Sequence, residues 1–392
     1  MRLPALLLLA LSFAAAPAIA QTPCGGSFAS FVSDLKQEAR ARGHDRGTVE
    51  RFFASVRQDA GVLRADRAQG FFQKPFTEFA RSLISSNRMQ HGKANARKWD
   101  SLFGHIETRY GVSRGILLAF WAFETDYGGF QGNTNTRDAL VTLAHDCRRP
   151  HLFRPQIFAA LTLFSRGELD PDRTTGAWAG EIGMVQMLPS DILENGVDGD
   201  GDGKVSLKTS PQDALMSGAR MLRSLGWHAG QPWLQEVQVP ERMDWSQSGI
   251  DTSMRAAQWQ RMGVRPRSGR LLAPDLPASL ILPQGHKGPA FLAYPNFKVL
   301  FEWNQSFTYV LTAAYFASRL EGAPVFDPGN PDRGLGQAQM KQLQRRLAAR
   351  GHDVGGVDGI LGAGTRAAVQ AEQERLGMPA DAWPTQALLN RL

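Results

Sequence analysis

The most informative stretch of the chain is residues 114–129, which read Arg-Gly-Ile-Leu-Leu-Ala-Phe-Trp-Ala-Phe-Glu-Thr-Asp-Tyr-Gly-Gly. Nine uncharged residues at 115–123 lead directly to Glu124, and the glycines at 128–129 provide a helix end. A helix that is apolar on every side must be buried. The last turn of this predicted helix therefore carries Glu124 to the edge of an apolar core.

Glu124 is the candidate functional residue of this stretch. Removing a carboxylate from water disfavours its charged form, so a buried Glu124 should have a raised pKa. A carboxyl group that keeps its proton near neutral pH can act as a general acid. The alternative is a glutamate at a helix end that turns toward solvent, and the periodicity by itself favours that alternative.

A second informative segment is residues 177–190, which read Ala-Trp-Ala-Gly-Glu-Ile-Gly-Met-Val-Gln-Met-Leu-Pro-Ser. The glycines at 180 and 183 permit close approach of the backbone, and Gln186 can offer both a donor and an acceptor to a sugar. Taken alone, this segment would be an ordinary glycine-containing turn before a helix.

Together the two segments resemble the lytic transglycosylases of the membrane-bound lytic transglycosylase B type. That family's signatures are E-T-x-Y-G, which matches 124–128, and G-x-x-G-x-x-Q-x-x-P-S, which matches 180–190. A third match is Trp-Asn-Gln-Ser at 303–306, followed by Tyr309, which is similar to the family's aromatic-Asn-x-Ser helix. The resemblance covers residues 27–321.

The resemblance implies a lysozyme-like fold and cleavage of the β-1,4 bond between MurNAc and GlcNAc in peptidoglycan, leaving 1,6-anhydromuramyl ends. It implies that Glu124 protonates the glycosidic oxygen and then takes the proton of the attacking C6 hydroxyl, without a cofactor. The matching positions that would contact the sugar are Tyr127, Gln186, Trp303, Asn304 and Tyr309.

Two positions depart from the family pattern. Ala177 stands where some members carry a serine that bonds to the catalytic acid, so we expect activity with altered tuning of that acid. Glu181 stands where close relatives often have alanine. It is either a solvated loop residue or a second carboxylate that would allow hydrolysis.

Two other functions remain open at this point. A muramidase would hydrolyse the same bond with a pair of carboxylates, here Glu124 with Asp126 or Glu181. A noncatalytic scaffold would bind the wall with a vestigial Glu124. A signalling protein of the EF-hand class is a more distant alternative, because the chain has a single, incomplete loop of that kind.

That loop is Asp-Gly-Asp-Gly-Asp-Gly-Lys at 198–204, which repeats the first half of an EF-hand. The full pattern needs Glu at its twelfth position, where Thr209 stands, and Asp213 is a plausible late ligand. We expect a structural Ca²⁺, with Na⁺ as the alternative ion and an acidic turn as the alternative without one. Its ligands would be Asp198, Asp200, Asp202, the Lys204 carbonyl and Asp213.

The C-terminal residues 337–392 have their own helical periodicity. Their L-Q-x-x-L at 343–347 and V-D-G-x-x-G-x-x-T at 357–365 resemble a peptidoglycan-binding module of three short helices. A dimerisation or stability bundle is the alternative. A module of this kind beside a catalytic domain would raise the effective concentration of a polymeric substrate.

The N-terminus predicts export. Met1-Arg2 precedes an apolar run at 3–16, and Ala18-Ile-Ala20 closes it, as in a secretory signal peptide at 1–20. The run is shorter than the roughly 20 residues that a bilayer span needs, so a membrane anchor is the weaker alternative and we expect no integral membrane segment. We expect a periplasmic protein.

The two cysteines of the chain, Cys24 and Cys147, support the same compartment. In an oxidising compartment an even pair is more often bridged than free, so we expect a disulfide between them. Two thiols are too few for a cysteine-based zinc site.

Composition bounds the remaining classes. The 392 residues are 43% hydrophobic and 21% charged, which excludes disordered and fibrous proteins and indicates two or three domains. The net charge of +7 favours polyanionic partners, namely nucleic acid, anionic lipid or an acidic wall polymer. Export argues against nucleic acid, and the family resemblance implies the glycan strands of peptidoglycan as the partner.

We therefore expect a mainly α (α+β) monomer, with proteins of wall synthesis or division as an open partner class. Its domains would be a lysozyme-like domain at 21–321, a linker at 322–336 and a three-helix peptidoglycan-binding domain at 337–392. A small β-containing subdomain is expected within 232–296. The clearest helices are predicted at 28–42, 92–110, 114–123, 154–166 and 211–225, and the clearest strands at 235–239, 280–282 and 290–294.

Overall fold

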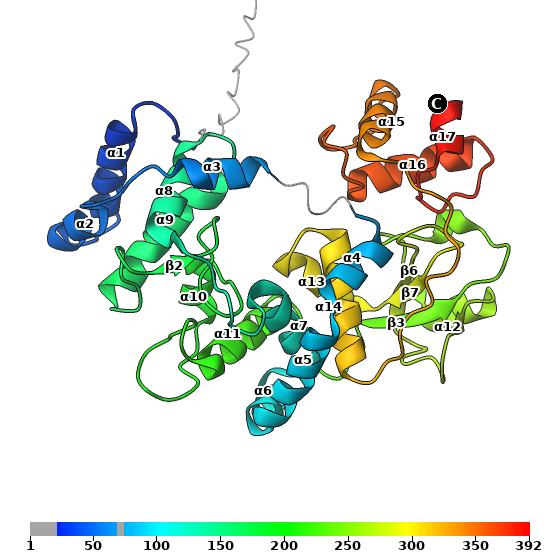
Figure 1. The fold of residues 1–392 in the computed structure, drawn as a ribbon, viewed down its shortest axis with the longest axis horizontal. Coiled ribbons are helices and arrows are strands. Elements are labelled where there is room, and N and C mark those ends of the chain that lie inside the picture. Colours follow the sequence, from blue (N-terminus) through cyan, green and yellow to red (C-terminus); the bar gives the residue numbers. More distant parts are fainter. Residues whose placement is uncertain (1–21, 69–73) are drawn as a thin grey trace, which may run out of the picture.

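The computed structural model describes residues 22–68 and 74–392, and it is mostly helical (Figure 1). The signal peptide expected at 1–20 lies outside the described residues. The elements are α1 (Phe28–Ala41), α2 (Arg46–Phe53), α3 (Ala60–Arg67), α4 (Phe76–Leu83), α5 (Ser86–Lys98), α6 (Asp100–Tyr110), α7 (Arg114–Thr125), β1 (Thr134–Asn135), α8 (Thr136–His145), α9 (Pro150–Ser165), β2 (Thr175–Gly176), α10 (Pro189–Asn195), α11 (Pro211–Ser224), β3 (Leu234–Gln238), η2 (Trp245–Gln247), β4 (Met254–Arg255), α12 (Ala256–Arg261), β5 (Arg265–Pro266), β6 (Pro277–Ile281), β7 (Ala290–Ala293), α13 (Pro295–Trp303), α14 (Phe307–Leu320), α15 (Gln337–Ala349), α16 (Ala363–Arg375) and α17 (Gln386–Arg391).

Helix α7 is the apolar helix that the sequence predicts, and it lies at the centre of the fold. Every residue from Gly115 to Ala122 is buried. The helix packs against α14, α5 and α11. A Cβ at Gly115 would lie 2.9 Å from the carbonyl oxygen of Ala317 on α14, so glycine lets the two helices approach closely.

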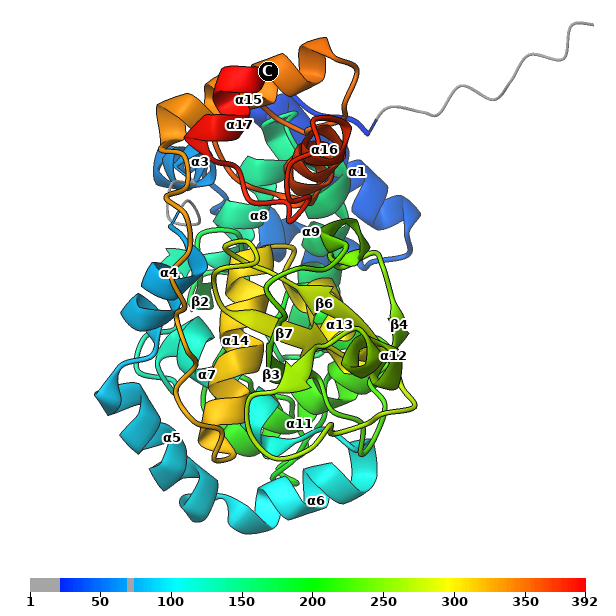
Figure 2. The same ribbon diagram turned by 90° about the vertical axis from the view of Figure 1, so that its right-hand side faces the viewer.

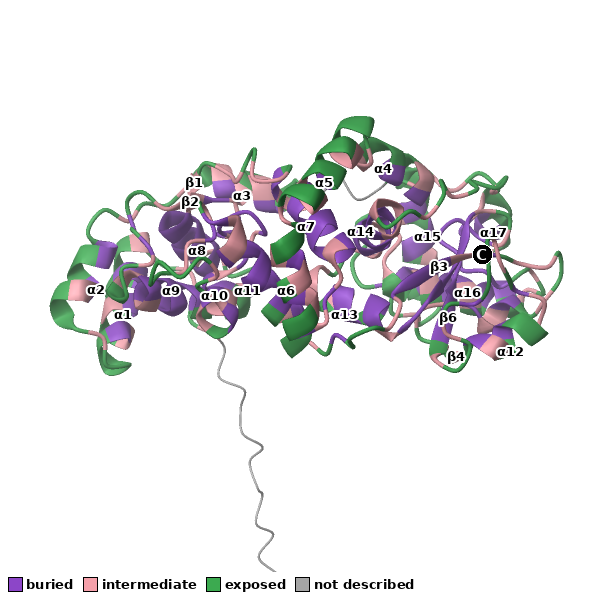
Figure 3. Cartoon of the chain, turned by 90° about the horizontal axis from the view of Figure 1, so that it is seen from below, coloured by how far each residue is buried: buried purple, intermediate pink, exposed green. Residues whose placement is uncertain are grey.

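The single helix predicted over 92–110 is two helices in the structure, and that prediction is wrong in this respect. Helix α5 ends at Lys98 and α6 begins at Asp100, with Trp99 between them at φ −108° and ψ 24°. Trp99 packs against the core, and the Asp100 carboxylate pairs with Arg114 at 2.6 Å. The chain therefore bends where Trp99 packs on the core and Asp100 forms its ion pair. Figure 3 shows α5 mostly exposed, whereas α6 has buried as well as exposed residues.

The expected β-containing subdomain is confirmed as one antiparallel sheet with strand order β4-β6-β7-β3-β5. Its central strands pair Leu280 with Leu292 and Leu234 with Ala293. Trp259 and Tyr294 fill a separate apolar cluster on this sheet. The sheet lies beside α13 and α14 (Figure 2), and α14 in turn packs against α7.

The C-terminal helices α15, α16 and α17 enclose their own apolar cluster, which includes Leu343, Leu347 and Leu388. They also dock on the sheet subdomain (Figures 1 and 2). The Gln370 side chain donates to the carbonyl of Ser248 at 2.9 Å, and His286 bonds Asp381 at 2.6 Å. The C-terminal helices are therefore held against the rest of the protein.

The connecting segment at 322–336 contains no helix, and side-chain contacts hold it along its length. The Phe326 ring packs against Phe76 and Tyr315, with centroids 5.2 and 4.9 Å away. Lys287 pairs with Asp332 at 2.9 Å. The distance between the two ends of this segment is therefore set by packing, and not by the statistics of a flexible chain.

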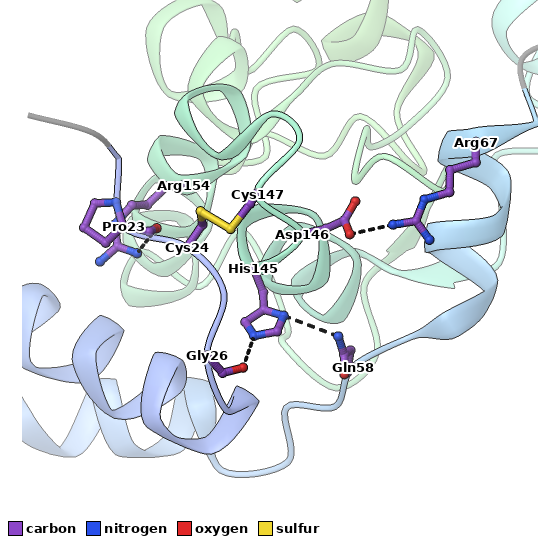
Figure 4. Close-up of a disulfide and its surroundings, with 9 residues drawn as sticks. All are labelled: Pro23, Cys24, Gly26, Gln58, Arg67, His145, Asp146, Cys147 and Arg154. Atoms are coloured by element: carbon purple, nitrogen blue, oxygen red, sulfur yellow. Dashed lines mark hydrogen bonds and ion pairs between the residues drawn. A yellow bond between two sulfur atoms is a disulfide. The ribbon is translucent and has the colours of Figure 1, made fainter. Parts of the chain in front are cut away.

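The disulfide between Cys24 and Cys147 is present and ties the segment before α1 to the end of α8 (Figure 4). Hydrogen bonds surround it. The Gly25 amide donates to the His145 carbonyl at 2.9 Å, and Arg154 donates to the Pro23 carbonyl at 3.3 Å. The bond encloses a sequence separation of 123 residues.

Candidate active site

Glu124 lies in the last turn of α7, at the wall of a pocket. Its Oε1 atom accepts a hydrogen bond from the Tyr309 hydroxyl at 2.5 Å and from the Trp303 indole N–H at 3.4 Å. Burial raises the pKa of Glu124 to about 7, the two hydrogen bonds oppose that shift, and the charge of Glu181 adds to it. The carboxyl group thus has the raised pKa that its apolar helix predicts.

The pocket beside Glu124 has a volume of about 320 Å³, which is within the range of small-ligand sites. It brings together Gln186, Trp303 and Asn304 from segments that are far apart in the sequence. The other lining residues are Ala177, Trp178, Glu181, Met187, Leu188, Asp191 and Met221.

The loop between β2 and α10 forms one wall of the pocket. Gly183 has φ +82°, and a Cβ there would lie 2.4 Å from the Leu207 side chain, so the tight turn requires glycine. The Gln186 side-chain amide donates to the Gly183 carbonyl at 2.7 Å. The Thr125 hydroxyl donates to the Met184 carbonyl at 2.7 Å and ties this wall to the end of α7.

Two aromatic residues that the sequence singles out, Trp303 and Tyr309, donate hydrogen bonds to Glu124. Trp303 stacks on Phe120 of α7, with ring centroids 4.4 Å apart. Tyr309 is buried and does not line the pocket, but its hydroxyl reaches the carboxyl group directly. The sequence suggested a cleft wall for Tyr309, and the hydrogen bond to Glu124 is information that only the structure provides.

Asn304 joins the pocket to the start of α14. Its side-chain oxygen accepts the Ser306 amide N–H at 2.9 Å, and the Ser306 hydroxyl in turn caps the Tyr309 amide. The Asn304 side-chain N–H₂ group remains as a hydrogen-bond donor for a ligand.

Tyr127 and Asp126 lie outside this pocket. Both have positive φ, at 61° and 52°, where the chain leaves α7. The Tyr127 hydroxyl donates to the Arg88 carbonyl at 2.8 Å, and Asp126 pairs with the Arg88 side chain at 3.0 Å. The structure therefore places these two side chains against α5.

Asp191 and Met221 also line the pocket, although no sequence motif pointed to them. The Asp191 carboxylate accepts the Leu188 amide N–H at 3.2 Å, which is a capping interaction at the start of α10. Burial raises the pKa of Asp191. The Pro-Ser-Asp start of α10 was the available signal for such a cap. Met221 gives no signal, because it is one of many apolar residues on α11.

The acidic loop at 198–204 is compact. Carboxylate oxygens of Asp198, Asp200 and Asp202 lie within 4.8 Å of one another, and in the described part of the chain this is the one such group of acidic, histidine or cysteine residues. Asp198 accepts the amides of Gly201 and Gly203 at 2.7 and 2.8 Å. The loop is thus already folded around its first acid.

Asp213 and Lys204 take different positions in the same loop. Asp213 is fully buried at the start of α11, where its carboxylate accepts the amides of Gly199 and Ser206 at 2.8 and 2.7 Å. It holds the loop from inside and is not part of the three-acid group. The Lys204 side chain is exposed, and its amide donates to Asp202 at 2.9 Å. The oxygen-only donor set of the loop fits a hard cation such as Ca²⁺.

A mostly helical domain with one proton-retaining glutamate, in a pocket lined by indole and amide groups, defines a lysozyme-like enzyme that acts on polysaccharides. The sequence model of the Transglycosylase SLT domain family matches residues 27–318, and that of a peptidoglycan binding domain matches 336–392. The chain belongs to this family of lytic transglycosylases, whose members cleave peptidoglycan between MurNAc and GlcNAc and leave anhydro ends.

Three known proteins illustrate the relationship. The structure of SltB3 from Pseudomonas aeruginosa, in complex with NAG-anhNAM-pentapeptide, has 39% sequence identity and a TM-score of 0.86, and the match covers 94% of this chain and 99% of that one. Membrane-bound lytic murein transglycosylase B of Escherichia coli strain K12 is 25% identical over 301 residues, which is 73% of this chain and 82% of the relative. The Escherichia coli lytic transglycosylase Slt35 in complex with calcium shares the fold, with a TM-score of 0.65, 24% identity and coverage of 78% and 98%.

These findings confirm the resemblance inferred from the three motifs and the expected lysozyme-like fold. Within residues 22–68 and 74–392, the helices are too short or too polar to cross a bilayer.

Proposed function

We propose that Glu124 is the acid and then the base of a lytic transglycosylase reaction on the glycan strands of peptidoglycan. Glu124 gives its proton to the oxygen that links the MurNAc anomeric carbon to GlcNAc, and that bond breaks. The C6 hydroxyl oxygen of MurNAc then bonds to the anomeric carbon and returns its proton to Glu124. No water is consumed, so one carboxyl group suffices. The raised pKa of Glu124 is the observation that supports this proposal.

The other pocket residues have supporting roles in this proposal. Gln186 and Asn304 hold the sugar and its N-acetyl group, because both present amides at the pocket wall. Trp303 offers an aromatic wall. Tyr309 orients Glu124 through its hydroxyl, and Tyr127, which the family resemblance assigns to sugar contact, holds the end of α7 in place.

Analysis of the products tests the reaction class. We expect digestion of purified peptidoglycan to release fragments whose MurNAc ends are lighter by one water than reducing ends, because the C6 oxygen replaces water as the attacking group. Mass spectrometry of the released fragments distinguishes the two. Reducing ends as the main product would overturn the proposal in favour of a muramidase.

That second function rests on Glu181, which lines the same pocket as Glu124 and could activate a water molecule. Asp126 does not support it, because this side chain pairs with Arg88 against α5 and is not a pocket residue. The noncatalytic scaffold predicts no released fragments at all.

The proposal extends to the whole chain. Residues 21–321 form the catalytic part, 322–336 connect it, and 337–392 bind the wall, in agreement with the two family matches. The protein acts in the periplasm after removal of residues 1–20, which the disulfide and the family's substrate both support. It works as a monomer on glycan strands, without nucleic acid, and its protein partners are those of wall synthesis or division.

The acidic loop binds a structural Ca²⁺ in this proposal, with Na⁺ as the alternative ion and no part in catalysis. Asp198, Asp200, Asp202 and the Lys204 carbonyl would be ligands, because their oxygens belong to one preformed loop. Asp213 would act as a late ligand only if it released its bonds to the loop amides, and it otherwise holds the loop in shape. The likeness to a calcium-containing transglycosylase fold agrees with this assignment.

Calcium removal should lower the melting temperature by several degrees, because an ion that binds only the folded state stabilises it by about 2.7 kcal/mol at 100 times its dissociation constant. The measurement is thermal unfolding with calcium, with sodium alone and with a chelator. The variant Asp200→Ala, which removes a ligand oxygen, should lose the response, whereas Asp251→Ala, outside the loop, should keep it. Identical melting in all three conditions would contradict a bound cation.

A further inference from the structure

A second and larger pocket lies between the C-terminal helices and the rest of the protein. Its volume is about 980 Å³, which is at the upper end of the range for small-ligand sites. Helix α16 and the loop before it line one side, and α13, the start of α14 and residues 281–284 line the other. The reaction proposed for Glu124 gives this pocket no role.

Arg366, in the first turn of α16, lies in the wall of this pocket with most of its hydrogen-bonding capacity unused. A guanidinium group has five N–H donors. Among the described residues, the one partner of these donors is the Pro283 carbonyl, which accepts from Nη2 at 2.9 Å. The Nε N–H is buried without a partner, which is costly and calls for an explanation. The group also lies 4.6 Å from the centroid of the Phe307 ring on α14.

Arg366 has no carboxylate paired with it within residues 22–68 and 74–392. The acid whose charge acts on it is Asp381. That carboxylate already bonds His286 at 2.6 Å through one oxygen and accepts the Gln373 side chain at 3.0 Å through the other. Burial lowers the pKa of Arg366 to about 10, and the charge of Asp381 opposes that shift. The guanidinium therefore stays a cation at neutral pH, without an anion to neutralise it.

Two helix N-termini reach the same pocket. Residues 306–308 at the start of α14 and residues 362–363 at the start of α16 are part of its wall. The first turn of a helix has backbone N–H groups without intrahelical partners and carries the positive end of the helix dipole. The start of α16 has no side-chain cap. With the cation of Arg366 beside them, these two helix ends favour an anionic ligand.

The other acidic side chains of the pocket wall leave this position open. Asp332 pairs with Lys287 at 2.9 Å. Glu78 and Asp251 are exposed to solvent. The wall also carries the exposed cation Lys298, on α13.

This pocket adjoins the active site along one short stretch of chain. Trp303 and Asn304 line the pocket of Glu124, and residues 305–308, which follow directly, line the second pocket. An extended peptide of four or five residues spans roughly 13–18 Å. A peptide attached to a sugar in the first pocket is therefore long enough to enter the second.

We propose that this second pocket binds a carboxylate of the short peptides that MurNAc carries in peptidoglycan, with Arg366 as its anchor. The inference rests on the proposed function, because the peptide belongs to the strand that the active site cleaves. The carboxylate accepts hydrogen bonds from the guanidinium and lies at the first turn of α16. A peptide-bearing strand is then held by its sugar at Glu124 and by its peptide between the two parts of the chain.

Binding of a small probe to the full chain tests the site. The probe is the dipeptide acetyl-alanyl-alanine, whose carboxylate is its single charge, and its control is the same dipeptide with an amidated C-terminus. We expect the amide to bind the wild type at least about tenfold more weakly in an NMR titration, because charge-assisted hydrogen bonds are the stronger kind. Arg366→Gln should weaken binding of the carboxylate probe to a similar extent. Arg366→Lys, which keeps the positive charge, should restore part of it.

Two further variants serve as controls for Arg366. Arg345→Gln makes the same change at an exposed position of α15 outside the pocket, and it should bind the probe like the wild type. Lys298→Gln removes an exposed cation of the pocket wall, and it should weaken binding about threefold. Because Arg366 also bonds Pro283, thermal unfolding checks that each variant is folded.

Fragment release from two substrates connects the site with the reaction. From peptide-bearing strands at low concentration, Arg366→Gln should release fragments about fivefold more slowly than the wild type. From strands stripped of their peptides, the two should release fragments at the same rate. Glu124→Gln should fail on both substrates while it still binds the dipeptide, so a failure of the reaction and a failure of this site are distinguishable.

Three outcomes would overturn the inference. The first is equal binding of the carboxylate and the amide by the wild type, which needs no variant. The second is wild-type binding of the carboxylate probe by folded Arg366→Gln. The third is an equal loss of release by Arg366→Gln on both substrates, because the side chain would then only hold α16 in place.

Discussion

The variant Glu124→Gln should release soluble fragments from peptidoglycan at least about 10³-fold more slowly than the wild type, within the range that general acid–base groups contribute. Glutamine has nearly the same shape, and its side-chain oxygen can still accept the hydrogen bonds from Tyr309 and Trp303. It has no acidic proton to give to the leaving oxygen. The loss should therefore appear in the rate of bond cleavage, measured by chromatography and mass spectrometry of the released fragments.

The matched control is Glu241→Gln, which makes the same chemical change at an exposed position. It should release fragments at the wild-type rate. Wall binding, measured by co-sedimentation with insoluble peptidoglycan, should persist in Glu124→Gln, because α15, α16 and α17 have their own apolar cluster. Release by Glu124→Gln at the wild-type rate would exclude Glu124 as the acid.

The sequence predicted α7 from local pattern, whereas that pattern by itself favoured a Glu124 side chain turned toward solvent. An uninterrupted apolar run has to enter the core, whatever the rest of the chain does. The gathering of Gln186, Trp303 and Asn304 around Glu124 could not be derived in that way. Together with Glu124 these residues come from three separate segments, and only the family resemblance placed them together before the structure did.

The structure also adds contacts that no periodicity encodes. The hydrogen bond from Tyr309 to Glu124 spans a sequence separation of 185 residues. At the break after Trp99, Asp100 forms an ion pair with Arg114, which lies on a different helix. Pairing of this kind is set by tertiary packing, which overrides the helical preference of the segment.

The segment at 322–336 illustrates the same limit. Its prolines, glycines and lack of an apolar period are typical of a linker. Yet Phe326 packs beneath the sheet subdomain, and Arg267 donates to the Val325 carbonyl at 2.6 Å. With the ion pair between Lys287 and Asp332, these contacts hold a segment that looks flexible in sequence. The C-terminal helices are therefore held in a set position relative to the pocket.

Removal of the disulfide in the double variant Cys24→Ser/Cys147→Ser should lower the free energy of unfolding by about 5 kcal/mol, the chain-entropy estimate for a long enclosed loop. The bond encloses a sequence separation of 123 residues, and the unfolded chain without it gains the conformations that the bond forbids. Denaturant unfolding followed by tryptophan fluorescence measures the change. Reductant should destabilise the wild type similarly and leave the double variant unaffected.

The position of the disulfide predicts which helices lose stability when the bond is removed. Cys24 precedes α1 and Cys147 follows α8. Helix α7, in contrast, packs against α14 and α5, which the disulfide does not touch. Hydrogen exchange should therefore quicken first in α1, α2 and α3, while α7 and α14 keep their protection. Uniform loss across all five helices would show that the bond stabilises the domain as one cooperative unit. In that case its removal would also loosen the loop at 177–188, because Gly180 packs directly on Leu140 of α8.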